Sequence, residues 1–143
     1  MSDPLHVLII GCGYVGRRAA RRWIDSGARV TALTRSPENA RQLRDAGIHP
    51  ILGDVTRPET LDALPGADVV LHAVGLDRQS GHSQREVYVN GLENILQRLA
   101  ERTSRFIYVS STSVYGQNCG EVVDEQSACN PTTPNGQVCL DAE

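Results

Sequence analysis

Hydrophobic and polar residues form alternating blocks along the chain, and these blocks predict strands and helices in turn. Short apolar runs rich in branched residues are typical of strands buried on both faces of a parallel sheet. They lie at 5–10, 29–34, 67–74 and 106–110, and a further short run lies at 48–52. The last of these contains Pro50, which predicts a place at the sheet edge. Helical spacing predicts helices at 14–26, 37–46 and 85–103, and a shorter one at 58–64.

The order of these elements predicts an α/β fold with a doubly wound parallel sheet, the Rossmann fold. The predicted buried stripe of the first helix is Val15, Ala19, Ala20, Trp23 and Ile24, and that of the third long helix is Val87, Gly91, Leu92, Ile95, Leu96 and Leu99. The second helix has clear start and stop signals, with Ser36 as N-cap, Pro37 at its first position and Gly47 after its end. The whole chain, 1–143, is therefore expected to form one domain.

The first strand runs directly into a glycine motif, and this junction is the strongest functional signal in the chain. Residues 11–16, GCGYVG, fit the pattern G-x-G-x-x-G. In that pattern Gly11 permits the tight turn, Gly13 leaves room for a diphosphate, and Gly16 lets the helix pack close to the strand. The helix N-terminus, with Tyr14 and Val15, offers free N–H groups to phosphate. The junction predicts that this chain binds a dinucleotide.

The end of the second strand bears on which dinucleotide binds. A carboxylate is typical there when the ligand is NAD, because it hydrogen-bonds the ribose 2′-hydroxyl. This chain has Thr34 and Arg35 instead, followed by Ser36. A guanidinium pairs with a 2′-phosphate through two hydrogen bonds, so the sequence favours NADP, with NAD as the alternative. Arg35 as an ordinary surface residue and Ser36 as a simple helix cap are the structural alternatives.

Further candidate binding residues follow the third and fourth strands. Asp54 and Val55 stand where an adenine would be contacted, although Asp54 also suits the start of a turn. Ala73, Val74 and Gly75 end the fourth strand beside the expected nicotinamide ribose.

Three neighbouring features complete the picture. His72 is interpreted as a structural strand histidine with satisfied hydrogen bonds. The polar segment 77–84 is expected to act as a mobile lid over the cofactor, and Arg17 and Arg18 stand near the phosphate end of the first helix.

Composition narrows the class of protein. The net charge of −3 argues against a nucleic-acid partner, and no apolar run reaches the roughly 18 residues of a membrane helix. The four cysteines form no C-x-x-C pair and no metal-ligand spacing with histidine, so we expect no metal site and free thiols in a cytoplasmic protein. The chain stops within a helix that begins near Asn135, which predicts that it is the front part of a longer protein. An exposed fifth strand would allow pairing into a homodimer.

With these motifs placed, the chain resembles the extended short-chain dehydrogenase/reductase superfamily, in its NAD(P)-dependent epimerase/dehydratase group. The segment 106–116, FIYVSSTSVYG, is similar to the family pattern F-I-x-x-S-S-x-x-V-Y-G. The segments 71–75 and 89–91 also resemble family motifs, H-x-A-G and N-V-x-G-T. The resemblance implies that Ser111 is the catalytic hydroxyl, and we include Ser113 of the same turn as a second candidate.

The departures from the family pattern are equally informative. Alignment on Pro134 places Asn135 where the family has its catalytic tyrosine and Cys139 where it has its lysine. Tyr88 replaces the asparagine of N-V-x-G-T, and Tyr88 or Tyr115 is a candidate substitute acid. The resemblance therefore implies an atypical member that keeps the cofactor cradle. Two functions stay open: an oxidoreductase or epimerase acting on a sugar-like or carbonyl small molecule, and a non-catalytic NADP(H) sensor or scaffold.

Overall fold

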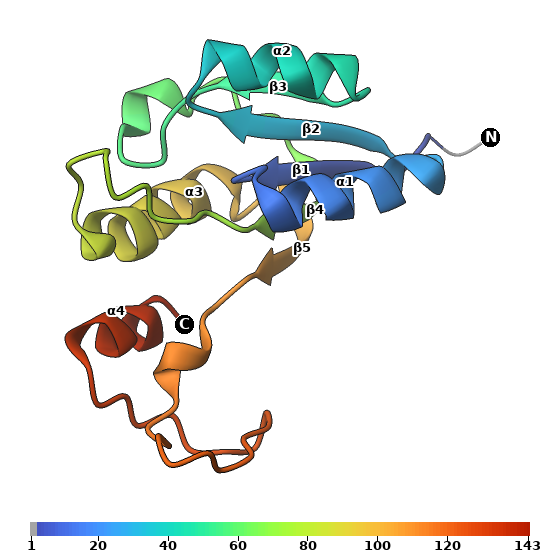
Figure 1. Ribbon diagram of the computed structural model, residues 1–143. Coiled ribbons are helices and arrows are strands. Elements are labelled where there is room, and N and C mark those ends of the chain that lie inside the picture. The colour runs from blue at the N-terminus through green and yellow to red at the C-terminus, as the bar shows by residue number, and fades with distance from the viewer. Residues whose placement is uncertain (1–2) are drawn as a thin grey trace.

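A computed structural model describes residues 3–143 and shows a five-stranded parallel sheet in the order β3-β2-β1-β4-β5 (Figure 1). This order confirms the predicted doubly wound α/β fold. The strands are β1 His6–Ile10, β2 Arg29–Thr34, β3 His49–Leu52, β4 Ala67–His72 and β5 Thr103–Tyr108. The α-helices are α1 Tyr14–Asp25, α2 Pro37–Asp45, α3 Gly91–Leu99 and α4 Pro134–Ala142. Short helical turns are η1 Pro58–Thr60, η2 Glu86–Asn90 and η3 Thr112–Val114.

β1 is the centre of the sheet and of two hydrophobic cores. All five of its residues are buried, and successive side chains point to opposite faces. Val7 and Ile9 join the core beneath α1 and α2, whereas Leu8 and Ile10 join the core beneath α3. Because both faces are covered, the continuous apolar run of β1 is the pattern that a parallel sheet requires.

The connections reverse direction at β1, and this reversal places the functional site. β1 pairs with β2 on one side, where Ile10 lies opposite Leu33. It pairs with β4 on the other side, where Ile10 lies opposite His72. The loops that leave β1 and β4 therefore diverge toward opposite faces. A crevice opens at such a switch point, outside the carboxyl ends of the strands.

Local signals explain where several elements begin. The Ser36 side chain accepts a hydrogen bond from the Asn39 N–H at 3.2 Å and caps α2, as predicted. The Thr133 side chain caps α4 in the same way, through the N–H of Gly136 at 3.0 Å. β3 lies at the sheet edge, which confirms the expectation drawn from Pro50.

Other predicted boundaries and faces are wrong. The helix expected at 85–103 begins with the π-helical turn η2 and ends at Leu99, and Thr103 opens β5. Only residues 58–60 of the helix expected at 58–64 are helical. Val15 is 48% exposed because it lies in the first turn of α1, beyond the end of the sheet. Leu96 is 40% exposed and lies outside the buried stripe of α3.

The last part of the chain stands beside the β5 edge, where α4 follows the irregular segment 115–133 (Figure 1). α4 contacts η2 and η3. The approach to η3 is close: a Cβ at Gly136 would lie 2.3 Å from the carbonyl oxygen of Ser113. Only glycine fits there, so α4 is held against the turn that carries Ser111. Among residues 3–143, no helix is long and apolar enough to cross a membrane.

Candidate functional site

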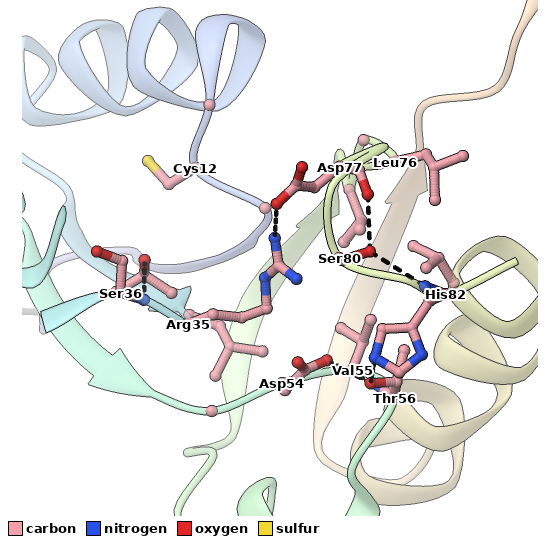
Figure 2. Close-up of a pocket in the computed structure, with 18 of the residues that line it drawn as sticks. Cys12, Arg35, Ser36, Asp54, Val55, Thr56, Leu76, Asp77, Ser80 and His82 are labelled. Carbon is pink, nitrogen blue, oxygen red and sulfur yellow. Dashed lines mark hydrogen bonds and ion pairs between the residues drawn. The ribbon is translucent and has the colours of Figure 1, made fainter. Parts of the chain in front are cut away.

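A cavity of about 630 Å³ opens at the carboxyl ends of β1, β2 and β4 (Figure 2). Its lining brings together residues that the sequence analysis singled out on separate elements. They are Gly11, Gly13, Thr34, Arg35, Ser36, Asp54, Val55, Ala73, Val74 and Gly75. The topology thus places the segments that follow β1, β2, β3 and β4 around one ligand-sized space.

The three motif glycines have different roles. Gly11 has φ +86°, and a Cβ there would lie 2.7 Å from the backbone of Val74. A Cβ at Gly16 would lie 2.7 Å from the carbonyl oxygen of Gly11, so Gly16 serves the packing of α1 against the turn. Gly13 differs, because a Cβ there would meet no protein atom within 4 Å. The protein leaves this position open at the helix N-terminus, which fits a bound diphosphate.

Arg35 extends across the cavity and is bonded to Asp77. Its Nη2 donates to the Asp77 Oδ2 at 3.2 Å, and both side chains are about half exposed (Figure 2). Arg35 follows β2 and Asp77 follows β4, so the ion pair spans the end of β1 that lies between those strands. The N–H of Gln79 donates to the other carboxylate oxygen at 3.0 Å. That bond and Arg35 hold the pKa of Asp77 below its ordinary value, so Asp77 is ionised at neutral pH.

Asp54 lies on the opposite side of the cavity from the glycine turn. Its Oδ1 accepts two hydrogen bonds from Thr56, from the N–H at 2.9 Å and the hydroxyl at 2.7 Å. Burial alone would raise the pKa of Asp54, but these bonds and the charge of Arg35 hold it below the ordinary value. Within residues 3–143 the Oδ2 atom accepts no hydrogen bond. Asp54 therefore makes the turn that the sequence allowed and also keeps an acceptor for a ligand.

The segment after β4 closes one rim of the cavity. Ser80 donates to the carbonyl oxygen of Asp77, and the His82 Nε2 lies 3.4 Å from the Thr56 hydroxyl (Figure 2). The segment is thus tied to the β3 side of the site as well as to Arg35. The mobility expected of 77–84 stays a prediction, since these contacts define only its position.

A second cavity, of about 330 Å³, continues from the first. Both are lined by Gly13 and by Ala73, Val74 and Gly75. The second cavity extends past Tyr14 and Val15 to the end of β5, with Ser110 and Ser111, and to Cys139 of α4. Two connected cavities that meet at Gly13 match the two halves of a dinucleotide joined by a diphosphate.

The second cavity is lined by three tyrosines, Tyr14, Tyr88 and Tyr108. The Tyr88 hydroxyl accepts a hydrogen bond from the Leu76 N–H at 3.1 Å, so its own proton is available to a ligand. Burial raises the pKa of Tyr108, and Cys139, Glu143 and Tyr88 raise it further. Tyr115 lines neither cavity and donates to the carbonyl oxygen of Asp124 at 2.9 Å. Of the two tyrosines that the sequence offered as substitute acids, the structure places only Tyr88 at the site.

The hydroxyl-rich turn is arranged by a local bond. The Ser111 Oγ lies 2.9 Å from the Ser113 Oγ and accepts the Ser113 N–H at 3.2 Å. Ser111 lines the second cavity and Ser113 does not. Cys139 is buried against the same cavity, where the family pattern has lysine. None of the described residues that line this cavity is lysine, arginine or histidine.

Other candidates lie away from the cavities. Arg17 bonds Asn39 and Gln42 of α2, and Arg18 lies 3.5 Å above the Tyr14 ring. The expectation that His72 is hydrogen-bonded is wrong. It is 1% exposed, and neither ring nitrogen has a partner among the residues that the structure describes. Burial between β-strand neighbours lowers its pKa to about 4.

Sequence reasoning placed the segment 77–84 over the cofactor, but it gave no individual role to Asp77, His82 or Tyr108. Asp77 and Arg35 are 42 residues apart, and only the strand order brings them together. A usable signal existed for Tyr108, since it stands two residues after Phe106 and so points to the same face, at the carboxyl end of the last strand. In the described part of the chain, no group of histidine, cysteine, aspartate or glutamate has metal-binding geometry, and the cysteines are unpaired.

Comparisons with known proteins agree with this geometry. Residues 7–137 match the NAD dependent epimerase/dehydratase family. Over 108 residues the chain is 34% identical to the 4-hydroxy-2-methyl-3-oxo-4-farnesyl-3,4-dihydroquinoline-1-oxide ketoreductase of Stigmatella aurantiaca, covering 73% of this chain and 32% of that protein. Over 143 residues it is 32% identical to Protein YeeZ of Escherichia coli strain K12, covering 96% of this chain and 51% of that protein.

The fold is shared with solved structures of lower sequence identity. The Bordetella bronchiseptica enzyme WbmG, in complex with NAD and UDP, matches with a TM-score of 0.79 at 18% identity, covering 98% of this chain and 48% of that one. The chain therefore spans about half, or less, of the length of these relatives.

Proposed function

The chain belongs to the NAD dependent epimerase/dehydratase family, and on this premise we propose that it binds NADP(H) along the two connected cavities. The family binds an NAD(P) dinucleotide. In this proposal the adenosine half lies in the first cavity and the nicotinamide half in the second. The observation that carries it is the open position at Gly13, where the two cavities meet at the start of α1.

Each part of the site has a distinct task in this proposal. The backbone from Gly11 to Gly13 and the free N–H groups of α1 hold the diphosphate. Arg35 pairs with the 2′-phosphate, and this pairing supports a preference for NADP, with NAD as the alternative. Asp54 accepts a hydrogen bond from the adenine amino group through its free Oδ2, beside the apolar side chain of Val55.

The proposed reaction is that of an oxidoreductase or epimerase on a sugar-like or other carbonyl compound. The nicotinamide supplies or accepts a hydride at C4 when it is bound. Ser111 orients the substrate oxygen by a hydrogen bond, and the Ser113 hydroxyl fixes the orientation of Ser111. Tyr88, which lines the same cavity as Ser111, is the proposed proton donor to this oxygen.

A non-catalytic NADP(H) sensor or scaffold is the second candidate. The observation that favours it is the replacement of the tyrosine and lysine by Asn135 and Cys139, which leaves the second cavity without a cation. A cation would stabilise a tyrosinate and so let the tyrosine act as a base near neutral pH. An amide and a thiol cannot supply that effect.

Titration calorimetry of the full-length protein with NADPH and NADH tests the binding proposal. We expect saturable binding of both, tighter for NADPH. Steady-state assays with NADPH and a panel of aldehydes, ketones and nucleotide sugars then separate the two functions. Turnover supports the enzyme, whereas tight binding without turnover across the panel supports the sensor. Absence of binding for both nucleotides would contradict either one.

A further inference from the structure

The first cavity carries both of the groups that dinucleotide sites use to tell NAD from NADP. A carboxylate selects the 2′-hydroxyl of NAD, and a guanidinium selects the 2′-phosphate of NADP. Here the guanidinium is Arg35 at the end of β2, and the carboxylate is Asp77, which comes from the loop after β4 instead of from β2.

Asp77 is held at the rim by contacts that do not depend on Arg35. Its Oδ1 accepts the Gln79 N–H, and its carbonyl oxygen accepts the N–H and the hydroxyl of Ser80. The same segment is tied to Thr56 through His82. A ligand that drew Arg35 away would therefore leave an ionised carboxylate in place beside its phosphate.

Arg35 has guanidinium N–H groups left to donate hydrogen bonds to a ligand. Within residues 3–143 its side chain donates only to Asp77, through Nη2, so the other guanidinium N–H groups are unused. Paired in this way, Arg35 and Asp77 together carry no net charge. A 2′-phosphate then meets a neutral pair instead of a free cation, and it is repelled by the carboxylate.

We propose that Asp77 sets how strongly this site discriminates between NADPH and NADH. Its carboxylate competes with the 2′-phosphate for Arg35 and accepts a hydrogen bond from the 2′-hydroxyl of NADH. The inference rests on the proposed function, since it assumes that the adenosine ribose lies beside Arg35. The inference goes beyond the proposed function because it states that Asp77, in the loop after β4, reduces the preference of the site for NADPH over NADH.

The test is the ratio of the dissociation constants for NADPH and NADH, measured by calorimetry on the full-length protein. Asp77→Asn keeps an oxygen that can accept the Gln79 N–H but removes the charge. We expect it to tighten NADPH binding about fivefold, as for one exposed charge interaction, and to leave NADH binding unchanged or weaker. Asp77→Ala should move the ratio in the same direction.

Asp62→Asn is the matched control. Asp62 also accepts from an arginine, Arg98, on the surface at 3.0 Å, but it lines neither cavity. It changes the net charge equally and should leave the ratio within twofold of the original. An unchanged ratio in Asp77→Asn, or an equal weakening of both nucleotides, would overturn the inference while the binding proposal stands. If the unaltered protein binds neither nucleotide, both fail.

Discussion

Gly11 lies directly against Val74, so closely that a Cβ on Gly11 would be 2.7 Å from the backbone nitrogen of Val74. This contact joins the loop after β1 to the loop after β4 and shapes the crevice between them. Gly13, two residues later, has no such neighbour. The first glycine therefore serves the packing of the two loops, and the second leaves open the position that we propose for the diphosphate.

Substitution at these two positions should separate folding from binding. Gly13→Val should abolish dinucleotide binding, because its side chain would fill the space proposed for the diphosphate, while unfolding free energy changes by less than about 1 kcal/mol. Gly11→Ala should lower the unfolding free energy by at least about 1–2 kcal/mol, because its φ of +86° is unfavourable for alanine. Calorimetry and urea denaturation measure the two effects. Normal NADPH affinity in Gly13→Val would contradict the placement of the diphosphate.

Charge reversal at Arg35 tests the preference for NADP. Arg35→Asp should weaken NADPH binding by at least about tenfold, because a charged hydrogen bond to the 2′-phosphate is lost and repulsion replaces it. NADH has no 2′-phosphate, so its dissociation constant should change much less. Arg41→Asp is the control, because Arg41 is an exposed residue of α2 that pairs with Glu38 outside the cavities. An equal loss of affinity for NADPH and NADH in Arg35→Asp would contradict the proposed preference for NADP.

The sequence predicted the elements whose signals are local. Residues within the segment itself predict the position of three features: the apolar run of β1, the glycine turn and the capped start of α2. The structure has all three where expected. The boundary between α3 and β5 was missed because residues 100–102 hold no glycine or proline to stop a helix. Pairing with β4, where Ala67 lies opposite Thr103, decides that boundary instead.

In the candidate site, too, features with a local sequence signal were predicted and features that depend on tertiary structure were not. Residues near the glycine turn and at strand ends were predicted, since parallel strands bring their carboxyl ends to one edge. The bond between Arg35 and Asp77 was not predicted, because it depends on the strand order rather than on any motif. The unsatisfied state of His72 was also missed, since a strand pattern predicts burial but not the absence of a partner.

The proposed loss of the acid/base pair is testable by replacement. In the full-length protein, Asn135→Tyr combined with Cys139→Lys should raise the rate of carbonyl reduction with NADPH by about 100-fold or more, the usual scale for general acid catalysis. Cys139 lines the cavity, so a lysine there reaches the same space. The Cys139→Lys single variant and Cys139→Ala are the controls. Equal rates in all four proteins would show that the missing pair does not limit activity.

Burial of neutral His72 should make the fold less stable in mild acid, because only the unfolded chain then binds a proton at this residue. Burial lowers its pKa from 6.5 to about 4, so between these values the unfolded chain binds a proton that the folded chain does not. Stability is therefore lost as the pH falls below 6.5, by about 2 kcal/mol between pH 7 and pH 5. Urea denaturation at both pH values measures this loss. His72→Leu should remove most of it, and the remainder includes His6, whose pKa is also lowered by burial. An undiminished loss in His72→Leu would show that other groups cause the acid sensitivity.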